Sequence, residues 1–474
     1  MPLKMVLSLK IGTLPARISN GLTLTLLPGM ALVPHGASAQ SGGPQTTKLS
    51  LRQAMQLGRE KPFQVRIAQE QAKEAQARSA TALGSLFPRI DFDAQRIKFD
   101  KAVNTATGES WAPQFPAQVT TAGLQVSQPI LGLLPLTLQA RAASMMAEVA
   151  QESASQARRD GALLAAQSFL NAVRAQQFFK IAQASLALVE KQKNDSEALY
   201  RAGKLSQADV MRFELSVADA RAQLTQAGVA KQLAYMALND TLMINAGEDD
   251  LDAPETSIFE EKNPAAPALD EVVKLALARR PELKAAQNQL KIAELTTWAA
   301  RLDYSPSVNA FARYDRDFEA QDLRGRSTDG SPAPLLAAKN DVRDKLAVGV
   351  QLKWQIWDWG TRWNKISETV AQRTKAEIAS EQATALLRTE VIKSYLDFKA
   401  STDALKTSLT SDKLAQEVYK LTQARFTNGQ ASSTDLITAE RDQARARAGL
   451  VAARSEVDLA WFRLQRNMGE EPSL

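Results

Sequence analysis

The residues best placed to do chemistry in this sequence lie in two copies of one short motif. The copies occupy residues 206–209 (Ser-Gln-Ala-Asp) and 432–435 (Ser-Ser-Thr-Asp), and a glycine, Gly203 or Gly429, precedes each by three positions. A Ser-x-x-Asp sequence at a helix start can exchange side-chain and backbone hydrogen bonds, and the glycine suits the left-handed end of a preceding helix. Two interpretations of the aspartates stay open: helix capping alone, or capping combined with a role facing a pore.

The sequence lacks the residues that most enzyme sites require. It contains no cysteine, and its only histidine is His35, close to the N-terminus. Beyond that position, disulfides, thiol nucleophiles, His- or Cys-based metal sites and Ser-His catalysis are therefore excluded. A site built from carboxylates alone stays open, but EF-hand, phosphate-loop and dinucleotide fingerprints are absent from the sequence. We predict a protein that is not an enzyme and has no cofactor or metal.

Residues 1–39 have the features of a secretory signal peptide. Basic residues precede a short apolar run over 22–33, and Ala37-Ser38-Ala39 fits the small-residue cleavage pattern. The run is shorter than the roughly 20 residues that a membrane-spanning helix needs, so we expect cleavage and export. The leader holds three basic and no acidic residues, so its removal lowers the formal net charge from +6 to +3. This small, dispersed excess argues against nucleic-acid binding.

Two copies of one unit follow the leader. Identical residues recur at a fixed offset of 226 positions, which is typical of an internal duplication. We predict repeat 1 over residues 40–246, an acidic, proline-containing linker over 247–268, and repeat 2 over 269–474. The linker lacks the glycine-spaced loop of a calcium site. The matched pairs include Gly123/Gly349, Gln125/Gln351, Ser168/Ser394, Glu214/Glu440 and Arg221/Arg447.

Each copy contains a pair of predicted strands, at about 88–130 and about 306–357. Apolar and polar residues alternate along them, so that Val350 and Leu352 share one face and Gln351 lies on the other. In an exported protein this pattern fits either a sheet on a core or a membrane β-barrel with lipid outside and a polar lumen. The length of about 10 residues favours the barrel, as does an aromatic group that we assign to the membrane interface, Trp354, Trp357 and Trp359.

Four strands cannot close a barrel, because an open sheet edge in lipid leaves backbone groups unpaired. Several chains must therefore share one barrel, and physics alone allows a dimer with eight strands or a trimer with twelve. We expect solvent-exposed loops between the paired strands, at about 96–118 and 316–345.

Long stretches with helical periodicity predict a helical hairpin in each copy, at 137–245 and at 362–468, and a further helix opens each copy. A helix of about 60 residues extends over on the order of 90 Å. Such a helix cannot lie inside one compact domain. The abundant alanine allows close approach in a wide coiled-coil ring, although a periplasmic helical bundle predicts the same composition.

Together these features resemble the TolC-like outer-membrane efflux proteins, over essentially the whole mature length. The resemblance rests on the duplication, the helix-strand-strand-helix-helix order, the paired Gly-x-x-Ser-x-x-Asp turns, and the strand ends at 128–131 and 354–357. It implies an α+β membrane protein in the outer membrane of a Gram-negative bacterium, extending into the periplasm. It also implies a homotrimer, in which a 12-stranded β-barrel with four strands per chain continues into a long α-helical coiled-coil barrel.

The resemblance implies a passive exit duct of a tripartite efflux or type I secretion system. Such a duct takes substrates from an inner-membrane transporter, and a periplasmic adaptor protein docks at its helical tips. Asp209 and Asp435 match the acidic positions of the tunnel constriction in the family. The tip residues expected to dock the adaptor are Gly203, Lys204, Leu205, Ser206, Gly429, Gln430, Ala431 and Ser432.

The sequence departs from the family at the residues that hold the tips shut. Phe426 and Ala431 stand where the best-known member has a tyrosine and an arginine, so we expect that latch to be absent. A periplasmic coiled-coil scaffold or adaptor would also explain the helices and the signal peptide, but it would not explain the strand pairs.

Overall fold

The computed structural model describes residues 48–98, 100, 103–107, 110–115, 118–247, 251, 252, 257, 259, 260, 268–318, 326, 327 and 344–471. For residues 103–107, 110–115, 118, 326 and 327 it describes the backbone only. The predicted signal peptide and most of the acidic linker lie outside the described residues. The described residues belong to the structural unit that spans 47–474.

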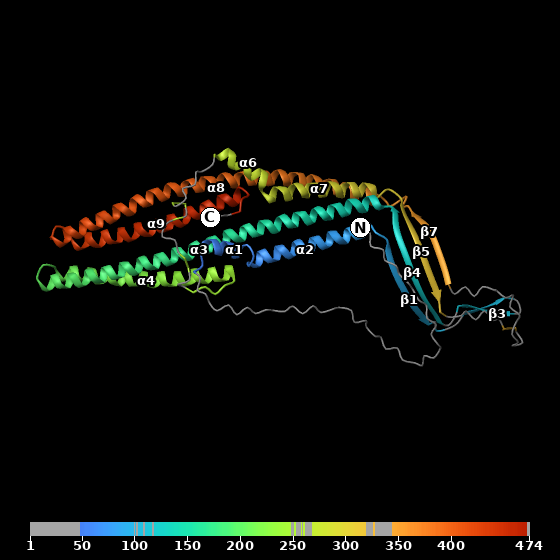
Figure 1. The fold of residues 1–474 in the computed structure, drawn as a ribbon, viewed down its shortest axis with the longest axis horizontal. Helices are drawn as coiled ribbons and strands as arrows, with labels where there is room; N and C mark the ends of the chain where they lie inside the picture. The colour runs from blue at the N-terminus through green and yellow to red at the C-terminus, as the bar shows by residue number, and fades with distance from the viewer. Residues whose placement is uncertain are drawn as a thin grey trace, which may run out of the picture. The chain divides into compact units, whose positions relative to one another are not determined.

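The first copy has the predicted order of helix, strand, strand, helix, helix. The predicted opening helix is divided at Pro62, which precedes the second of its two parts. The long hairpin begins directly after the strand pair (Figure 1). The elements are α1 (Leu51–Gly58), α2 (Phe63–Gly84), β1 (Arg89–Lys98), β4 (Gln118–Leu131), α3 (Leu133–Arg201) and α4 (Gln207–Leu242).

The second copy repeats this order with closely similar lengths. Pro281 again stands at the division of the opening helix, where it occupies the first turn of the second part. The predicted mixed fold with an internal duplication is therefore confirmed. The elements are α6 (Leu269–Arg279), α7 (Pro281–Leu302), β5 (Ser307–Asp317), β7 (Asp344–Lys353), α8 (Thr361–Thr427) and α9 (Ser433–Asn467).

The four predicted strands form one antiparallel sheet in the order β1-β4-β5-β7. Its register aligns the apolar positions: Ala312 of β5 lies opposite Val126 of β4 and Val348 of β7. Among the described strands β1 and β7 are paired on one side only. The large residues of the apolar face are exposed in the single chain, namely Ile90, Phe92, Leu124, Tyr314, Leu346, Val348, Val350 and Leu352.

The segments expected to be loops contain three further strands, so the loop prediction is wrong in part. These are β2 (Val103–Thr107), β3 (Ser110–Phe115) and β6 (Arg326–Ser327), which form a second sheet in the order β2-β3-β6. The β3–β6 pairing joins the two copies, and short segments that depend on such distant partners carry little periodicity of their own. The last predicted strand is also too long, because β7 ends at Lys353 and the tryptophans follow it.

The two largest apolar cores of the helices lie one mainly in the first copy, with α9 of the second copy contributing, and one in the second copy. With 69 residues, α3 extends over roughly 100 Å, and it packs against α2, α4, α7 and α9. The partly buried Trp461 of α9 touches both cores. The first core includes Phe169, Leu238, Leu242 and Phe462, and the second includes Val391, Phe398, Val457 and Leu464.

A charge cluster ties the second opening helix to the hairpins. Arg280, at the break between α6 and α7, is only 4% exposed, and its guanidinium lies 2.8 Å from Glu282 and 3.0 Å from Glu390 of α8. Arg466 of α9 lies 2.9 Å from Glu390 and 2.7 Å from Asp160 of α3. Four helices therefore meet at two guanidinium groups.

The first copy also contains an unusually close helix contact. A Cβ added to Gly161 of α3 would collide with the carbonyl oxygen of Gly58 and lie 2.8 Å from Cγ2 of Val65. The corresponding position in the second copy is Leu387, a core residue. The duplicated units therefore pack their opening helices in different ways.

Gly161→Ala should destabilise the protein by about 1–3 kcal/mol, because the added methyl group overpacks a backbone contact. Gly449→Ala is the matched control, since it also changes a helical glycine but would meet no atom within 4 Å. It should be neutral or stabilising by up to about 1 kcal/mol. Equal thermal midpoints for the two variants would contradict the close contact.

Candidate functional site: the helical tips

The turns between the hairpin helices have the predicted glycine geometry. Gly203 and Gly429 have φ angles of +67° and +72°, which few other residues adopt without cost. The N–H of Gly203 donates to the Tyr200 carbonyl at 2.9 Å, and the N–H of Gly429 donates to the Phe426 carbonyl at 2.9 Å. Both bonds close the last turn of the preceding helix, as expected for such a cap.

Both predicted capping boxes are present. The Asp209 N–H donates to Ser206 Oγ at 3.3 Å, and the Ser206 N–H donates to Asp209 Oδ2 at 3.3 Å. In the second copy the Asp435 N–H donates to Ser432 Oγ at 3.1 Å, and the Ser432 N–H donates to Asp435 Oδ2 at 2.9 Å. The capping part of the interpretation is therefore confirmed for both aspartates.

The two aspartates differ in their exposure and in the contacts that they make outside the capping box. Oδ1 of Asp209 accepts a hydrogen bond from Ser433 of α9 and lies 3.1 Å from Arg212. Hydrogen bonds from the Ser206 and Ser433 hydroxyls lower the pKa of Asp209. Asp435 is exposed, and mainly the hydrogen bond from the Ser432 backbone lowers its pKa. Asp209 thus joins the two hairpins, whereas Asp435 presents its charge to solvent.

An aromatic contact joins the same two tips. Phe426 lies edge-on to Phe213 of α4, with ring centroids 6.0 Å apart. Both rings belong to a small apolar cluster with Tyr419, Leu436 and Ile437. Phe426 therefore contributes an apolar contact between the two hairpins of this chain. The hydrogen bond from Ser433 to Asp209 supplies the polar part of the contact between the two hairpins.

A buried carboxyl group lies above the tips, between the hairpins. Glu440 of α9 is 4% exposed and accepts a hydrogen bond from Ser185 of α3. Burial raises the pKa of Glu440. Nearby, Arg441 of α9 lies 2.8 Å from Asp219 of α4. This role could not be predicted from the sequence, because Glu214, the duplicate of Glu440, is the same residue type but is exposed in the single chain.

Glu440 should make stability depend on pH. Its pKa in the folded protein is raised above the ordinary value of 4.5, so its contribution is fully present below that value and is lost as pH rises through the raised pKa. The thermal midpoint of the wild type should therefore fall with rising pH more steeply than that of Glu440→Gln. An exposed glutamate of α8 supplies the control, Glu377→Gln, which should keep the wild-type slope. Identical slopes for wild type and Glu440→Gln would rule out this role.

The tryptophans assigned to the membrane interface lie between β7 and α8. Trp357 and Trp359 are exposed and pack edge-on, with centroids 5.8 Å apart. Trp354 Nε1 donates to the Tyr304 carbonyl at 3.2 Å. Arg362, which sequence reasoning missed, pairs with Asp358 at 2.6 Å and fixes this junction. Their position at the end of the sheet is compatible with an interfacial role, which stays a prediction.

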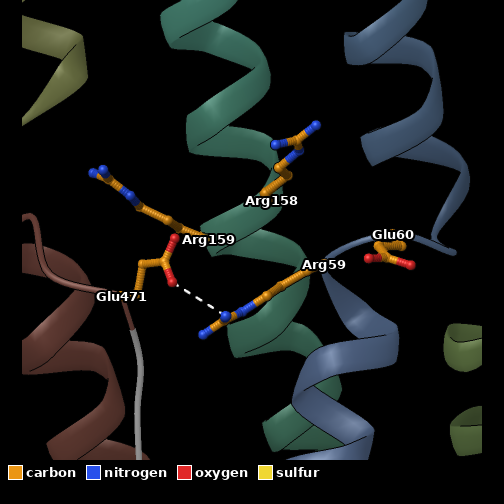
Figure 2. Close-up of a pocket in the computed structure, with 5 residues that line it drawn as sticks. All are labelled: Arg59, Glu60, Arg158, Arg159 and Glu471. Carbon is orange, nitrogen blue, oxygen red and sulfur yellow. Dashed lines mark ion pairs between the residues drawn. The ribbon is translucent and has the colours of Figure 1, made fainter.

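An arginine-lined pocket does not form a second site. Figure 2 shows Arg59 paired with Glu471, at 3.1 Å, while the side chains of Arg158 and Arg159 lead away from each other. The described residues contain no group of three side chains suited to holding a metal ion. None of the helices in the described part of the chain is long and apolar enough to cross a membrane.

Comparison with known proteins identifies the second repeat and the fold. Residues 272–470 match the family model of the outer membrane efflux protein. The solved structure of CusC is similar, with a TM-score of 0.74 at 15% identity, covering 92% of this chain and 96% of that chain. No curated protein matches the sequence.

Two further solved structures have a similar fold. The CmeC outer membrane channel of Campylobacter jejuni has a TM-score of 0.73 at 16% identity, covering 90% of this chain and 87% of that one. The outer membrane protein VceC of Vibrio cholerae has a TM-score of 0.72 at 16% identity, covering 89% and 97%. The predicted resemblance is therefore supported over the second repeat, which matches the outer membrane efflux protein family, and the described chain has the fold of these solved outer-membrane structures.

Proposed function

We propose that this efflux channel protein is the exit duct of a tripartite efflux or type I secretion system. It conducts substrates passively from an inner-membrane transporter across the periplasm and the outer membrane of a Gram-negative bacterium. The observation that carries the proposal is the β1-β4-β5-β7 sheet, whose apolar face is exposed and whose two outer strands are paired on one side only within the described part of the chain. A periplasmic scaffold or adaptor would not require a sheet with an exposed apolar face.

The unpaired strands require further copies of the chain. A homotrimer contributes twelve strands, which close a barrel around a passage, and the apolar face then meets outer-membrane lipid. The opposite face would line the lumen. It carries Arg313, which lies 2.8 Å from Asp315, and Lys345, which lies 2.8 Å from Asp317. A charged lining of this kind keeps a passage hydrated.

The helices place the tips far from this barrel, because α3 and α8 each run from the sheet to a tip (Figure 1). Roughly 100 Å of helix can therefore carry the duct from the outer membrane into the periplasm. At the tips Gly203, Lys204, Gly429 and Gln430 are exposed. We assign adaptor docking to the tip turns and the tunnel constriction to Asp209 and Asp435.

Photo-crosslinking in the native host tests the docking assignment. A photoreactive amino acid at Lys204 or Gln430 should give an adduct with a periplasmic adaptor protein, identified by mass spectrometry. The same amino acid at Lys375, an exposed position near the start of α8, is the control and should not capture the adaptor. Adaptor adducts at Lys375 and none at the tips would contradict the assignment.

A further inference from the structure

The two residues that form the contact between Ser185 and Glu440 both have duplicates in the same chain, and these duplicates do not contact each other. The offset of 226 positions carries Ser185 of α3 onto Ser411 of α8, and Glu440 of α9 onto Glu214 of α4. Both residue types are therefore retained. Within the chain, however, Ser411 and Glu214 are exposed, whereas Ser185 and Glu440 are hydrogen-bonded between the hairpins.

Apolar neighbours of this contact are duplicated in the same way. Leu188 of α3 packs against the tip cluster that contains Ile437 of α9. Their duplicates are Leu414 of α8 and Met211 of α4, which are 55% and 61% exposed in the single chain. Large apolar side chains thus lie uncovered beside Ser411 and beside Glu214.

These four positions carry the same kinds of side chain as the contact inside the chain, but in the single chain no other hairpin packs against them. If hairpins alternate around a ring, a contact made by α3 of the first hairpin with α9 of the second must recur between α8 of the second and α4 of the next first hairpin. That next hairpin belongs to another copy of the chain. The arrangement is head-to-tail, and it closes when the copies complete a ring.

We propose that α8 of one copy packs against α4 of the next, with the Ser411 hydroxyl donating to the Glu214 carboxylate and Leu414 packing near Met211. The inference rests on the proposed oligomeric duct and specifies the register of its subunit interface. It assigns each copy two different interface surfaces, one on α4 and one on α8.

The absence of cysteine from the chain allows a direct test. The double variant Glu214→Cys/Ser411→Cys is purified in detergent and treated with a short bifunctional maleimide. Denaturing gel electrophoresis should show the monomer band replaced by covalently linked copies up to the full ring. Ser185→Cys/Glu440→Cys should react within one chain and leave the band at monomer mass.

Three further variants control the register and the geometry. Each single cysteine variant should remain monomeric on the gel, because a head-to-tail interface does not bring identical positions together. Glu214→Cys/Ala404→Cys moves the second cysteine about two helical turns along α8 and should lose the linked products.

The outcomes separate this inference from the proposed function. The register alone would be overturned if mass measurement still shows the oligomer but the pair at 214 and 404 crosslinks as well as or better than the pair at 214 and 411. The same holds if the oligomer persists and the pair at 214 and 411 does not crosslink at all. A folded monomer by mass measurement would overturn the duct and the interface together.

Discussion

Leu352→Arg is expected to impair assembly of the barrel, because an arginine on the lipid face costs up to roughly 2–4 kcal/mol at the bilayer midplane and less towards the interface. Leu352 lies on the exposed apolar face of β7, opposite Val308 of β5. The neighbouring substitution Gln351→Arg should be tolerated, because Gln351 lies opposite Asn309 on the polar face. The measurement is the yield of oligomer that folds into lipid bilayers, as a function of denaturant.

The two substitutions differ by one position, so strand propensity and added charge are matched. Equal loss of assembly in both variants would show that the sheet does not separate lipid from a lumen. Equal tolerance would show that the apolar face does not lie in lipid at all.

The double variant Glu282→Gln/Glu390→Gln should destabilise the helical body by about 3–5 kcal/mol, because it leaves buried positive charge without a counter-charge. Arg280 is 4% exposed and would keep no carboxylate partner among the described residues, since its remaining contact, with Asn467 at 2.9 Å, is to a neutral side chain. Arg466 would keep only Asp160 among its acidic partners. Chemical denaturation of the oligomer in detergent measures the change.

Glu470→Gln is the control for this prediction. It removes a carboxylate 2.7 Å from Arg279, but both members of that pair are about half exposed. An exposed pair contributes about 0–1 kcal/mol, so this variant should unfold almost as the wild type does. A double variant as stable as Glu470→Gln would contradict the structural role of the Arg280 and Arg466 cluster.

The architecture was predictable because its signals are local. The change of period after Pro88 and after Pro306 marks the start of each strand pair, and the glycine turns end the first long helix of each hairpin within a few residues of the observed positions. The duplication supports each assignment independently, since every element had to occur twice. Capping was also predictable, because both partners of each box lie within four residues.

Contacts between distant segments could not be predicted from these signals. Nothing in the local sequence pairs Asp209 with Ser433, or Arg280 with Glu390, because these contacts depend on how whole hairpins pack. The second sheet was missed for the same reason. The duplication does not predict side-chain environment in every case. Glu214 and Glu440 are equivalent in the two copies, but Glu214 is exposed and Glu440 is buried in the single chain.

Current through planar lipid bilayers tests the central claim, that the oligomer is a duct. Wild-type oligomer should give discrete conductance steps, and Asp209→Ala should give larger ones, because it removes the contact of Asp209 with Ser433 that joins the hairpins. With a salt gradient, the reversal potential should show cation preference that decreases in Asp435→Asn, as charged rings in channels predict. Bilayers that contain inserted oligomer of both wild type and Asp209→Ala but carry no current would contradict the account.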